Sequence, residues 1–568
     1  MFSLRQDRLL LSLVSADSFH PLPAAEERSV FATLDPERRE SWIRRAQAAC
    51  LAPLPIATAS GYFGQDPETQ RAVLARREML KALCLGTCAL GEGRYIPRCA
   101  DLLYQISEES EWNAPDGSWP DAAETAHDQH AVKTAALLAT ASAVLENRAE
   151  PAVRRARQAI AARFTSPLID GTLQLPAEAE PEYLLNALTA LLFTEREDKR
   201  RWLGLRRLLP CLEKAMNGIP THGCRHGIEK HLQDALAFND SFELLRAASG
   251  GEVEARDDER FVSMARTFPM LHIDRRWFLN PGGQSMQPAI DPDELYRLGV
   301  GARIRSVCSL AAYLNRVQPS PSQPTLYTDT GSLYRQILTG LYRGDFLQEA
   351  AHAPKHDRID IPEMRLLAER GPDFFVALSG GGYGCACAGD YALFLNGRPV
   401  AVMSSLPDSD RHAPPLIDGC EQRPDGKASD IEVRCAPFYS LLTMDLASAY
   451  PGQAGVRSYQ RTLMHMPGER AVRLIDVYDL EQPSAVTFRL ITPLRPLEQD
   501  GRLLLSGIVE LNWDTDLDCR IGTINPEPPF DTLYRVEWQT RERSSHQSIS
   551  FVFQAADASG QAPAQSNI

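Results

Sequence analysis

The chain has 568 residues, a formal net charge of −14 and 44% hydrophobic residues. Its length predicts two or three domains, each large enough to bury a core of its own. The negative charge argues against a general nucleic-acid-binding protein, and no apolar run approaches the roughly 18–20 residues that span a membrane. We therefore expect a globular protein with neither nucleic acid nor a membrane as its partner.

The N-terminus carries a short apolar run, Leu9 to Val14, that is similar to the core of a signal peptide. The run is short and Asp7 interrupts the basic region before it, so we interpret it as an ordinary first segment. Twelve cysteines without the spacing of a small disulfide scaffold favour reduced thiols. These observations predict a cytoplasmic protein, with the periplasm as the alternative location.

Residues 25 to about 318 carry apolar side chains at helical spacing. Short breaks with proline or glycine separate the helical segments, so helical hairpins stacked side by side fit the pattern. We predict an all-α domain over residues 1–318. Its clearest helices are expected at residues 71–90, 122–146, 182–194 and 228–247.

Composition changes at Pro319, where a proline- and serine-rich stretch begins a predicted linker over residues 319–330. Beyond it the hydrophobic period becomes two, and many short strands with turns between them predict an antiparallel β-sandwich over residues 331–556. The tail, residues 557–568, is expected to be disordered. The clearest strands are expected at residues 374–378, 472–478, 485–491 and 548–553.

The most informative segment runs from Gly380 to Val400 and reads GGGYGCACAGDYALFLNGRPV. It begins as a glycine-rich loop and continues as an alternating strand, which Asn396-Gly397 closes as a hairpin. A loop without bulky side chains lets the backbone approach a ligand closely. Cys385 and Cys387 lie in this loop beside Tyr383, so the segment is a candidate for ligand or metal binding.

Other histidines and one tryptophan are each open to two interpretations. His226 and His231 lie near a helix start, where they either line a cleft or belong to a polar surface. His127 and His130 share a helix face, and without a third ligand nearby we interpret that face as solvated. Trp112 either stacks on a sugar ring or packs in the core.

Several blocks resemble the heparinase II/III-like polysaccharide lyases, over nearly the whole chain. Glu108-Glu-Ser-Glu-Trp112 is similar to the family's Glu-Glu-Ser-x-Trp. Gly223-Cys-Arg-His-Gly-Ile-Glu-Lys-His231 resembles its Gly-Cys-Asp-Glu-Gly-Pro-x-Tyr-Trp block. The resemblance implies an incomplete (α/α) toroid of helical hairpins followed by an antiparallel β-sandwich. The match continues through Gly380 to Val400, His412 to Gly426, Arg461 and Asp476.

The resemblance also implies β-elimination on an acidic, uronate-containing polysaccharide or oligosaccharide. That reaction needs a group that neutralises the uronate carboxylate, a base, and an acid near the leaving oxygen. The polar residues of the family are replaced here. Its Asn-Asn-Trp-Asn run falls on Ala177-Glu-Ala-Glu180, its Tyr-Trp pair on Lys230-His231, and its His-rich loop on Tyr383 to Cys387.

Two hypotheses about activity follow. In the first, the catalytic site is rebuilt, with Tyr383 or Lys230 as the base and with His231 and His226 as acids. In the second, the protein is a catalytically degenerate glycan-binding or scaffold protein of the same fold. A carboxylate at Glu180 would repel a uronate unless it is protonated or paired. The candidate substrate-binding residues are Arg225, Glu180 and Trp112.

A third hypothesis concerns a structural zinc, which the family's sandwich often carries. Cys385 replaces the family's loop histidine, Met403 replaces its aspartate, and His412 remains. Cys387 could restore the third ligand, so the predicted zinc ligands are Cys385, Cys387 and His412. Structural zinc sites usually have four ligands at wider cysteine spacing, and the alternative is that two small thiols fill a tight loop. A homodimer stays open, because the sequence does not reveal the oligomeric state.

Overall fold

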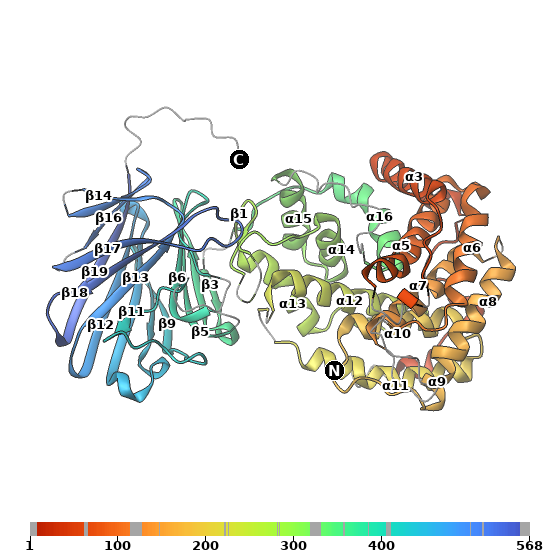
Figure 1. Ribbon diagram of the computed structural model, residues 1–568, viewed down its shortest axis with the longest axis horizontal. Coiled ribbons are helices and arrows are strands. Elements are labelled where there is room, and N and C mark those ends of the chain that lie inside the picture. Colours follow the sequence, from red (N-terminus) through yellow and green to blue (C-terminus); the bar gives the residue numbers. More distant parts are fainter. Residues whose placement is uncertain are drawn as a thin grey trace. The chain divides into compact units, whose positions relative to one another are not determined.

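The computed structural model describes two compact units (Figure 1), and the predicted linker and tail lie outside the described residues. The first unit comprises Met1–Ile219, Leu232–Ala265 and Ile290–His352, and the second comprises Pro220–His231, Arg266–Ala289 and Ala353–Ile568. The described residues are 8–556 except 26, 59, 62–65, 114–127, 147, 221–222, 225, 281, 283–284, 318–330, 356–357, 384–385, 405–410, 500 and 514–515, and the side chains of Tyr383 and Ala386.

The first unit is helical, as the sequence predicts, and two of its helices, α12 and α13, also contribute residues to the second unit. No helix in the described part of the chain is long and apolar enough to cross a membrane. The helices are α2 Arg28–Phe31, α3 Pro36–Leu51, α5 Pro67–Leu90, α6 Ile96–Ser107, α7 Gln129–Leu145, α8 Glu150–Ile160, α9 Ser166–Asp170, α10 Pro181–Thr194, α11 Asp198–Asn217, α12 Gly227–Ala248, α13 Glu259–Leu271, α14 Pro292–Gly301, α15 Arg305–Val317 and α16 Leu333–Gln348.

Local signals explain where the central helices begin and end. At the start of α5, the Asp66 carboxylate accepts hydrogen bonds from the backbone N–H groups of Glu68 and Thr69, and Gly91 ends the helix in the left-handed region at φ +66°. Helix α10 is buried along its whole length, which fits a helix that is apolar on all sides. The predicted helices at 71–90, 182–194 and 228–247 are confirmed within a few residues.

Helix α16 belongs to the first unit, although the sequence placed residues from 331 onward in the second domain. The reason is an ion-pair cluster that the sequence pattern does not show. Arg335 on α16 donates from Nε to Oδ2 of Asp240 on α12 at 2.7 Å, and Arg297 on α14 donates to the other oxygen of Asp240. All three side chains are buried, so this cluster holds α16 against the other helices.

The second unit contains three antiparallel sheets of eight, four and five strands and one small hairpin, among the described residues. The strand orders are β14-β15-β16-β19-β12-β11-β10-β9, β17-β18-β13-β8 and β3-β4-β5-β6-β7. The strands are β1 His272–Asp274, β2 Trp277–Phe278, β3 Arg358–Ile361, β4 Leu366–Arg370, β5 Phe374–Tyr383, β6 Ala386–Leu395, β7 Arg398–Ala401, β8 Leu416–Ile417, β9 Ser429–Cys435, β10 Ser440–Asp445, β11 Val456–Met466, β12 Ala471–Ser484, β13 Val486–Thr492, β14 Pro496–Gln499, β15 Arg502–Leu505, β16 Val509–Trp513, β17 Leu517–Ile524, β18 Leu533–Thr540 and β19 Ser544–Ala555.

One hydrophobic core receives side chains from all three large sheets. Strand β12 shows the pattern that produces it, since buried and less buried side chains alternate along most of its length. The small β1–β2 hairpin lies within the stretch that the sequence predicted as all-α. There the ring of His272 packs edge-on against Phe278, and the backbone carbonyl of His272 accepts a hydrogen bond from Arg370.

The segment predicted as a glycine-rich loop is mostly strand, which corrects that prediction. Strand β5 continues to Tyr383 and β6 begins at Ala386, with a shift of register between them. Gly381 permits this shift, because a Cβ there would lie 2.6 Å from the backbone nitrogen of Ala388. The predicted turn at Asn396-Gly397 is confirmed, with φ values of +51° and +74°.

A buried ion pair crosslinks the core strands of the second unit. Arg461 on β11 and Asp476 on β12 face each other in register, and both are 0% exposed. The guanidinium donates two hydrogen bonds of 2.8 Å to the carboxylate, from Nε and Nη2. Its Nη1 donates to the backbone carbonyls of Gly389 at 2.8 Å and Ala413 at 3.2 Å. Arg461 therefore joins the eight-stranded sheet to β6 and to the segment around His412.

Arg461→Ala is expected to lower the free energy of unfolding by about 3–5 kcal/mol, because it leaves Asp476 charged and buried without a partner. Chemical denaturation measures the change. Arg457→Ala is the matched control on the same strand, since its 3.9 Å contact with Asp479 is exposed and its loss is expected to cost about 0–1 kcal/mol. Equal effects of the two substitutions would contradict the structural role given to Arg461.

Candidate functional site

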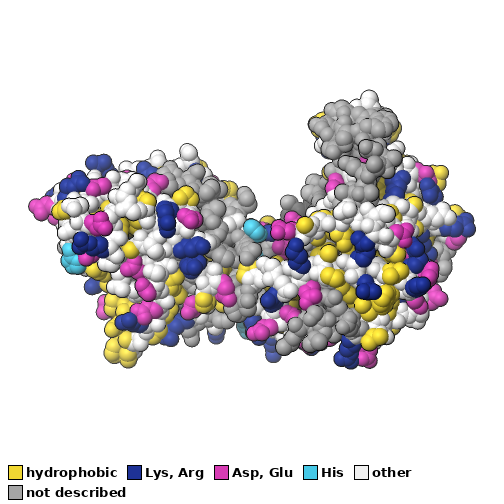
Figure 2. Space-filling view, turned by 90° about the horizontal axis from the view of Figure 1, so that it is seen from below, with side chains coloured by type: hydrophobic (Ala, Val, Ile, Leu, Met, Phe, Trp, Pro, Cys, Tyr) yellow, Lys and Arg dark blue, Asp and Glu magenta, His cyan; other side chains and the backbone are white. Residues whose placement is uncertain are grey.

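A cavity of about 360 Å³ lies within the helical unit, among α5, α7, α10 and the start of α16. Most of the side chains that line it are polar or charged, and a smaller number are apolar. A concave site that combines both kinds of side chain can hold a small ligand by hydrogen bonds and apolar contact. On the protein face shown in Figure 2, by contrast, basic and acidic side chains are interspersed. The cavity is therefore a candidate ligand-binding site built from described residues.

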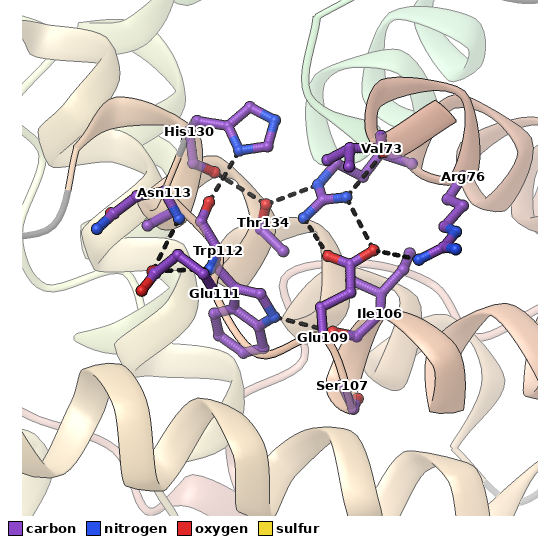
Figure 3. A network of polar contacts seen from close by, with 12 residues as sticks. Val73, Arg76, Ile106, Ser107, Glu109, Glu111, Trp112, Asn113, His130 and Thr134 are labelled. Atoms are coloured by element: carbon purple, nitrogen blue, oxygen red, sulfur yellow. Dashed lines mark hydrogen bonds and ion pairs between the residues drawn. The ribbon is translucent and has the colours of Figure 1, made fainter. Parts of the chain in front are cut away.

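A hydrogen-bonded network supports one wall of the cavity (Figure 3). Glu109 accepts from Nη1 of Arg76 at 3.0 Å and from Nη2 of Arg77 at 2.7 Å. Nε of Arg77 donates to the hydroxyl of Thr134 at 2.8 Å, and that hydroxyl donates to the backbone carbonyl of His130. The network ties the residues after α6 to the middle of α5 and to the first half of α7.

Trp112 is part of this support and is not a sugar-stacking platform, which corrects one of the two interpretations made from the sequence. The side chain is only 2% exposed, and its indole nitrogen donates to the backbone carbonyl of Ile106 at 2.8 Å. The guanidinium of Arg163 lies 4.8 Å from the centre of its ring. Trp112 is therefore a core residue, and its buried ring leaves no free face on which a sugar could stack.

His130 is a polar residue that sequence reasoning assigned to a solvated face, and the structure overturns that assignment. Its Nδ1 lies 2.8 Å from the backbone carbonyl of Trp112 (Figure 3), so Nδ1 carries the proton. Its Nε2 is then an acceptor, and it is buried without a hydrogen-bond partner in the part of the chain that the structure describes. Burial, followed by the nearby Arg77 charge, lowers the pKa of His130 and favours this neutral form.

The start of α12 carries three of the predicted catalytic and acid residues. His226 is exposed just before the helix, and Lys230 is half-buried in the first turn of α12. His231 is 6% exposed, and its ring centre lies 5.4 Å from that of Phe268. His231 is therefore packed in the unit rather than presented to solvent. The predicted clamp Arg225 and the side chain of the predicted base Tyr383 lie outside the described residues.

Asn280 holds the start of α12 in place. Its carboxamide oxygen accepts from the backbone N–H of Ile228 at 2.7 Å, and its nitrogen donates to Glu229 at 3.0 Å and to the carbonyl of Ser285 at 2.7 Å. Asn280 is 5% exposed, so these bonds are shielded from water. The sequence analysis did not select Asn280. The signal that could have indicated it is a single amide side chain just after the β1–β2 hairpin.

Glu180 is exposed at the start of α10, where it is the residue before the first helical position. Its side chain accepts no capping hydrogen bond from the helix. The carboxylate thus lies at a surface where the family resemblance implies a neutralising amide. Trp112 and Glu180 belong to the first unit, whereas His226, Lys230 and His231 belong to the second.

The second unit brings together Cys387, Asp390 and His412, whose sulfur, oxygen and nitrogen donor atoms lie within 4.8 Å of one another. Nδ1 of His412 lies 2.5 Å from Oδ2 of Asp390. The backbone N–H groups of Cys387 and Ala413 donate to the same carboxylate at 3.1 and 2.7 Å. Asp390 is 1% exposed and orients the imidazole ring. Thiolate, carboxylate and imidazole are all zinc ligands.

The predicted ligands Cys387 and His412 are thus neighbours, while Cys385 lies outside the described residues. Asp390 was missed by sequence reasoning, which looked for an aspartate near Met403. The missed signal was the spacing Cys387-Ala-Gly-Asp390 at the start of β6. The bend at Gly389, with φ +86°, lets the backbone turn between the thiol and the carboxylate.

Comparison with known proteins identifies the fold. No family model matches the sequence, and no curated protein matches it. Solved structures do match: a heparan sulfate lyase mutant from Pedobacter heparinus superposes with a TM-score of 0.59 and 14% identity, over 99% of this chain and 88% of that chain. A chondroitin AC lyase from Streptomyces coelicolor A3 gives 0.56 and 13% identity, over 94% and 82%. Heparinase III gives 0.55 and 12%, over 87% and 78%.

The chain has a polysaccharide lyase fold. The resemblance to heparinase II/III-like lyases that the sequence motifs indicate is therefore confirmed at the level of the fold. At identities of 10–14% the likeness to these lyases reaches no further than the fold. Within this fold, the polar residues that the family resemblance implies are replaced in this chain.

Asn280→Ala is expected to lower the free energy of unfolding by about 1–3 kcal/mol, because it leaves the buried N–H of Ile228 without an acceptor. Asn280→Asp keeps that acceptor but places a second carboxylate against Glu229, and we expect an intermediate loss. Chemical denaturation is the measurement. Asn512→Ala is the control, since its amide donates to the partly exposed carboxylate of Glu510 at 3.1 Å. A result in which Asn280→Ala is as mild as Asn512→Ala would contradict this role.

Proposed function

We propose that this protein is a polysaccharide lyase that acts on an acidic, uronate-containing polysaccharide by β-elimination. The observation that supports the proposal is the fold match over 99% of the chain to a heparan sulfate lyase. A second neighbour was crystallised in complex with chondroitin sulphate. As part of the proposal, the helices form an incomplete (α/α) toroid and the large sheets form a β-sandwich.

The proposed elimination transfers one proton to a base and one proton from an acid, and it moves two electron pairs. A base removes the proton from the carbon beside the carboxylate, and the released electrons form a carbon–carbon double bond. The glycosidic carbon–oxygen bond on the next carbon breaks, and an acid protonates the leaving oxygen. Lys230 is the proposed base, with Tyr383 as the alternative, and His226 is the proposed acid. His226 lies just before α12 and Lys230 lies in its first turn, and Arg225 remains the proposed carboxylate clamp.

A second candidate function is glycan binding without cleavage. Two observations favour it. The imidazole of His231 is buried against Phe268 and cannot meet a polymer without a rearrangement. Glu180 presents a carboxylate where the family resemblance implies an amide that neutralises the uronate. A chain with these two features would still have the fold and a carbohydrate-binding surface.

Ultraviolet absorbance of the unsaturated uronate product tests the lyase proposal on heparan sulfate, chondroitin sulfate, hyaluronate and alginate. We expect product from at least one polymer. Lys230→Ala is expected to lower kcat by about 100-fold or more, because it removes the proposed base. Lys199→Ala, an exposed lysine on α11, is the control and is expected to be neutral.

Polymer binding without product, measured by calorimetry on the same panel, would contradict the lyase and support the binding protein. Product formation that Lys230→Ala and Tyr383→Phe both leave unchanged would keep the lyase but overturn these residue assignments.

We also propose that Cys387, Asp390 and His412 hold a structural zinc ion. The donor set fits zinc, since three protein groups of suitable type converge within 4.8 Å. Cys385 or a water is the proposed fourth ligand. In this proposal the metal would link the start of β6 to the segment around His412, without taking part in the elimination.

Elemental analysis of protein purified without chelators tests the zinc site, and we expect about one zinc per chain. Cys387→Ser and His412→Ala are expected to lose most of it, because each removes one of the converging donors. Cys435→Ser, which alters an exposed thiol on β9, is the control and should retain the metal. Wild-type protein without zinc would show that the three side chains form only a hydrogen-bonded cluster.

A further inference from the structure

We infer that the cavity in the helical unit is a binding site for a neutral, hydroxyl-rich ligand of the size of a single hexose ring. The cavity lies within the first unit, and its volume of about 360 Å³ is at the lower end of the range for small-molecule pockets, roughly 300–1,000 Å³. The inference does not rest on the elimination proposed above, since it concerns only residues of the helical unit.

The charges in the wall favour a neutral ligand. The cations and carboxylates that line the cavity already have partners, and Lys133 is engaged as well. An anionic ligand would have to displace a carboxylate from its cationic partner, and a cationic ligand would be repelled by Lys81 and Lys133. Binding of either ion would therefore disturb an existing charge-assisted hydrogen bond. The pairs are Arg77–Glu109 at 2.7 Å, Lys81–Glu78 at 2.6 Å and Arg335–Glu182 at 3.2 Å.

The neutral polar groups of the wall favour a ligand that donates hydrogen bonds. Thr140 and Thr189 donate their hydroxyl protons to the carbonyls one helical turn before them, each at 2.8 Å. Their oxygens therefore remain as acceptors. His130 adds its Nε2, which is also an acceptor because Nδ1 carries the proton and which has no hydrogen-bond partner among the residues that the structure describes. A buried acceptor without a partner costs free energy, and a ligand hydroxyl would relieve that cost.

Apolar side chains complete the wall. Leu74, Leu137 and Leu333 line the cavity together with the ring of Tyr334. A hexose presents hydroxyl groups around its edge and C–H groups on its two faces. Such a ring can donate to the acceptors while its faces pack on the leucines and the tyrosine. Linear polyols carry the same hydroxyls but lose more conformational entropy when they bind.

Calorimetric titration of the full-length protein tests the inference with D-glucose, D-galactose and N-acetyl-D-glucosamine as neutral probes. D-Glucuronate is the matched anionic probe and glycerol the acyclic one. We expect at least one neutral hexose to bind more tightly than both comparison probes. The inference is overturned if no neutral sugar binds, or if D-glucuronate or glycerol binds more tightly.

Two variants locate the binding. Ala136→Leu adds side-chain volume inside the cavity and is expected to weaken sugar binding about tenfold or more while the melting temperature holds or rises. Thr189→Val removes one acceptor with little change of shape and is expected to weaken binding about fivefold. Ala48→Leu, at an exposed position of α3, is the control and should bind normally. Sugar binding that both cavity variants leave intact would overturn the assignment to this cavity.

Discussion

The β-sheet unit depends on the buried ion pair between Arg461 and Asp476. Two fully buried charges are tolerated only when their hydrogen-bonding capacity is used, and here the guanidinium reaches both carboxylate oxygens and two backbone carbonyls. Those carbonyls belong to Gly389 and Ala413, the immediate chain neighbours of Asp390 and His412. The same pair that joins β11 to β12 thus fixes the backbone on both sides of the candidate metal cluster.

The helical unit uses charge in a similar way. Asp240 is buried and serves two arginines, Arg297 and Arg335, from different helices. Close to the cavity, Glu109 holds Arg77, which in turn holds the hydroxyl of Thr134. Because structural pairing occupies these charges, the cavity offers a ligand neutral hydrogen-bonding groups and apolar surface. The proposed elimination and the proposed sugar site therefore use different residues of the chain.

Particular residues show how far the sequence could be interpreted. Helix α5 beside the cavity was predictable because apolar spacing, the Asp66 cap and Gly91 all agree locally, whereas α16 was not predicted. The proximity of Cys387 and His412 was predictable through the family resemblance. Asp390 and His130 were not, since each gains its role from a contact with a distant segment. The sequence around Trp112 does not distinguish core packing from stacking on a sugar. The contact between Arg163 and its ring shows that Trp112 packs in the core.

The sequence by itself determined the order of a helical part and a strand-rich part, the ends of their main elements and the resemblance to polysaccharide lyases. These features follow from periodicity, capping and turn residues, which act over a few neighbouring positions. The tertiary structure alone decided which polar side chains are buried, which are paired and which face a cavity. Those outcomes depend on contacts between residues far apart in the chain, such as Arg335 with Asp240. Local sequence patterns do not predict such contacts.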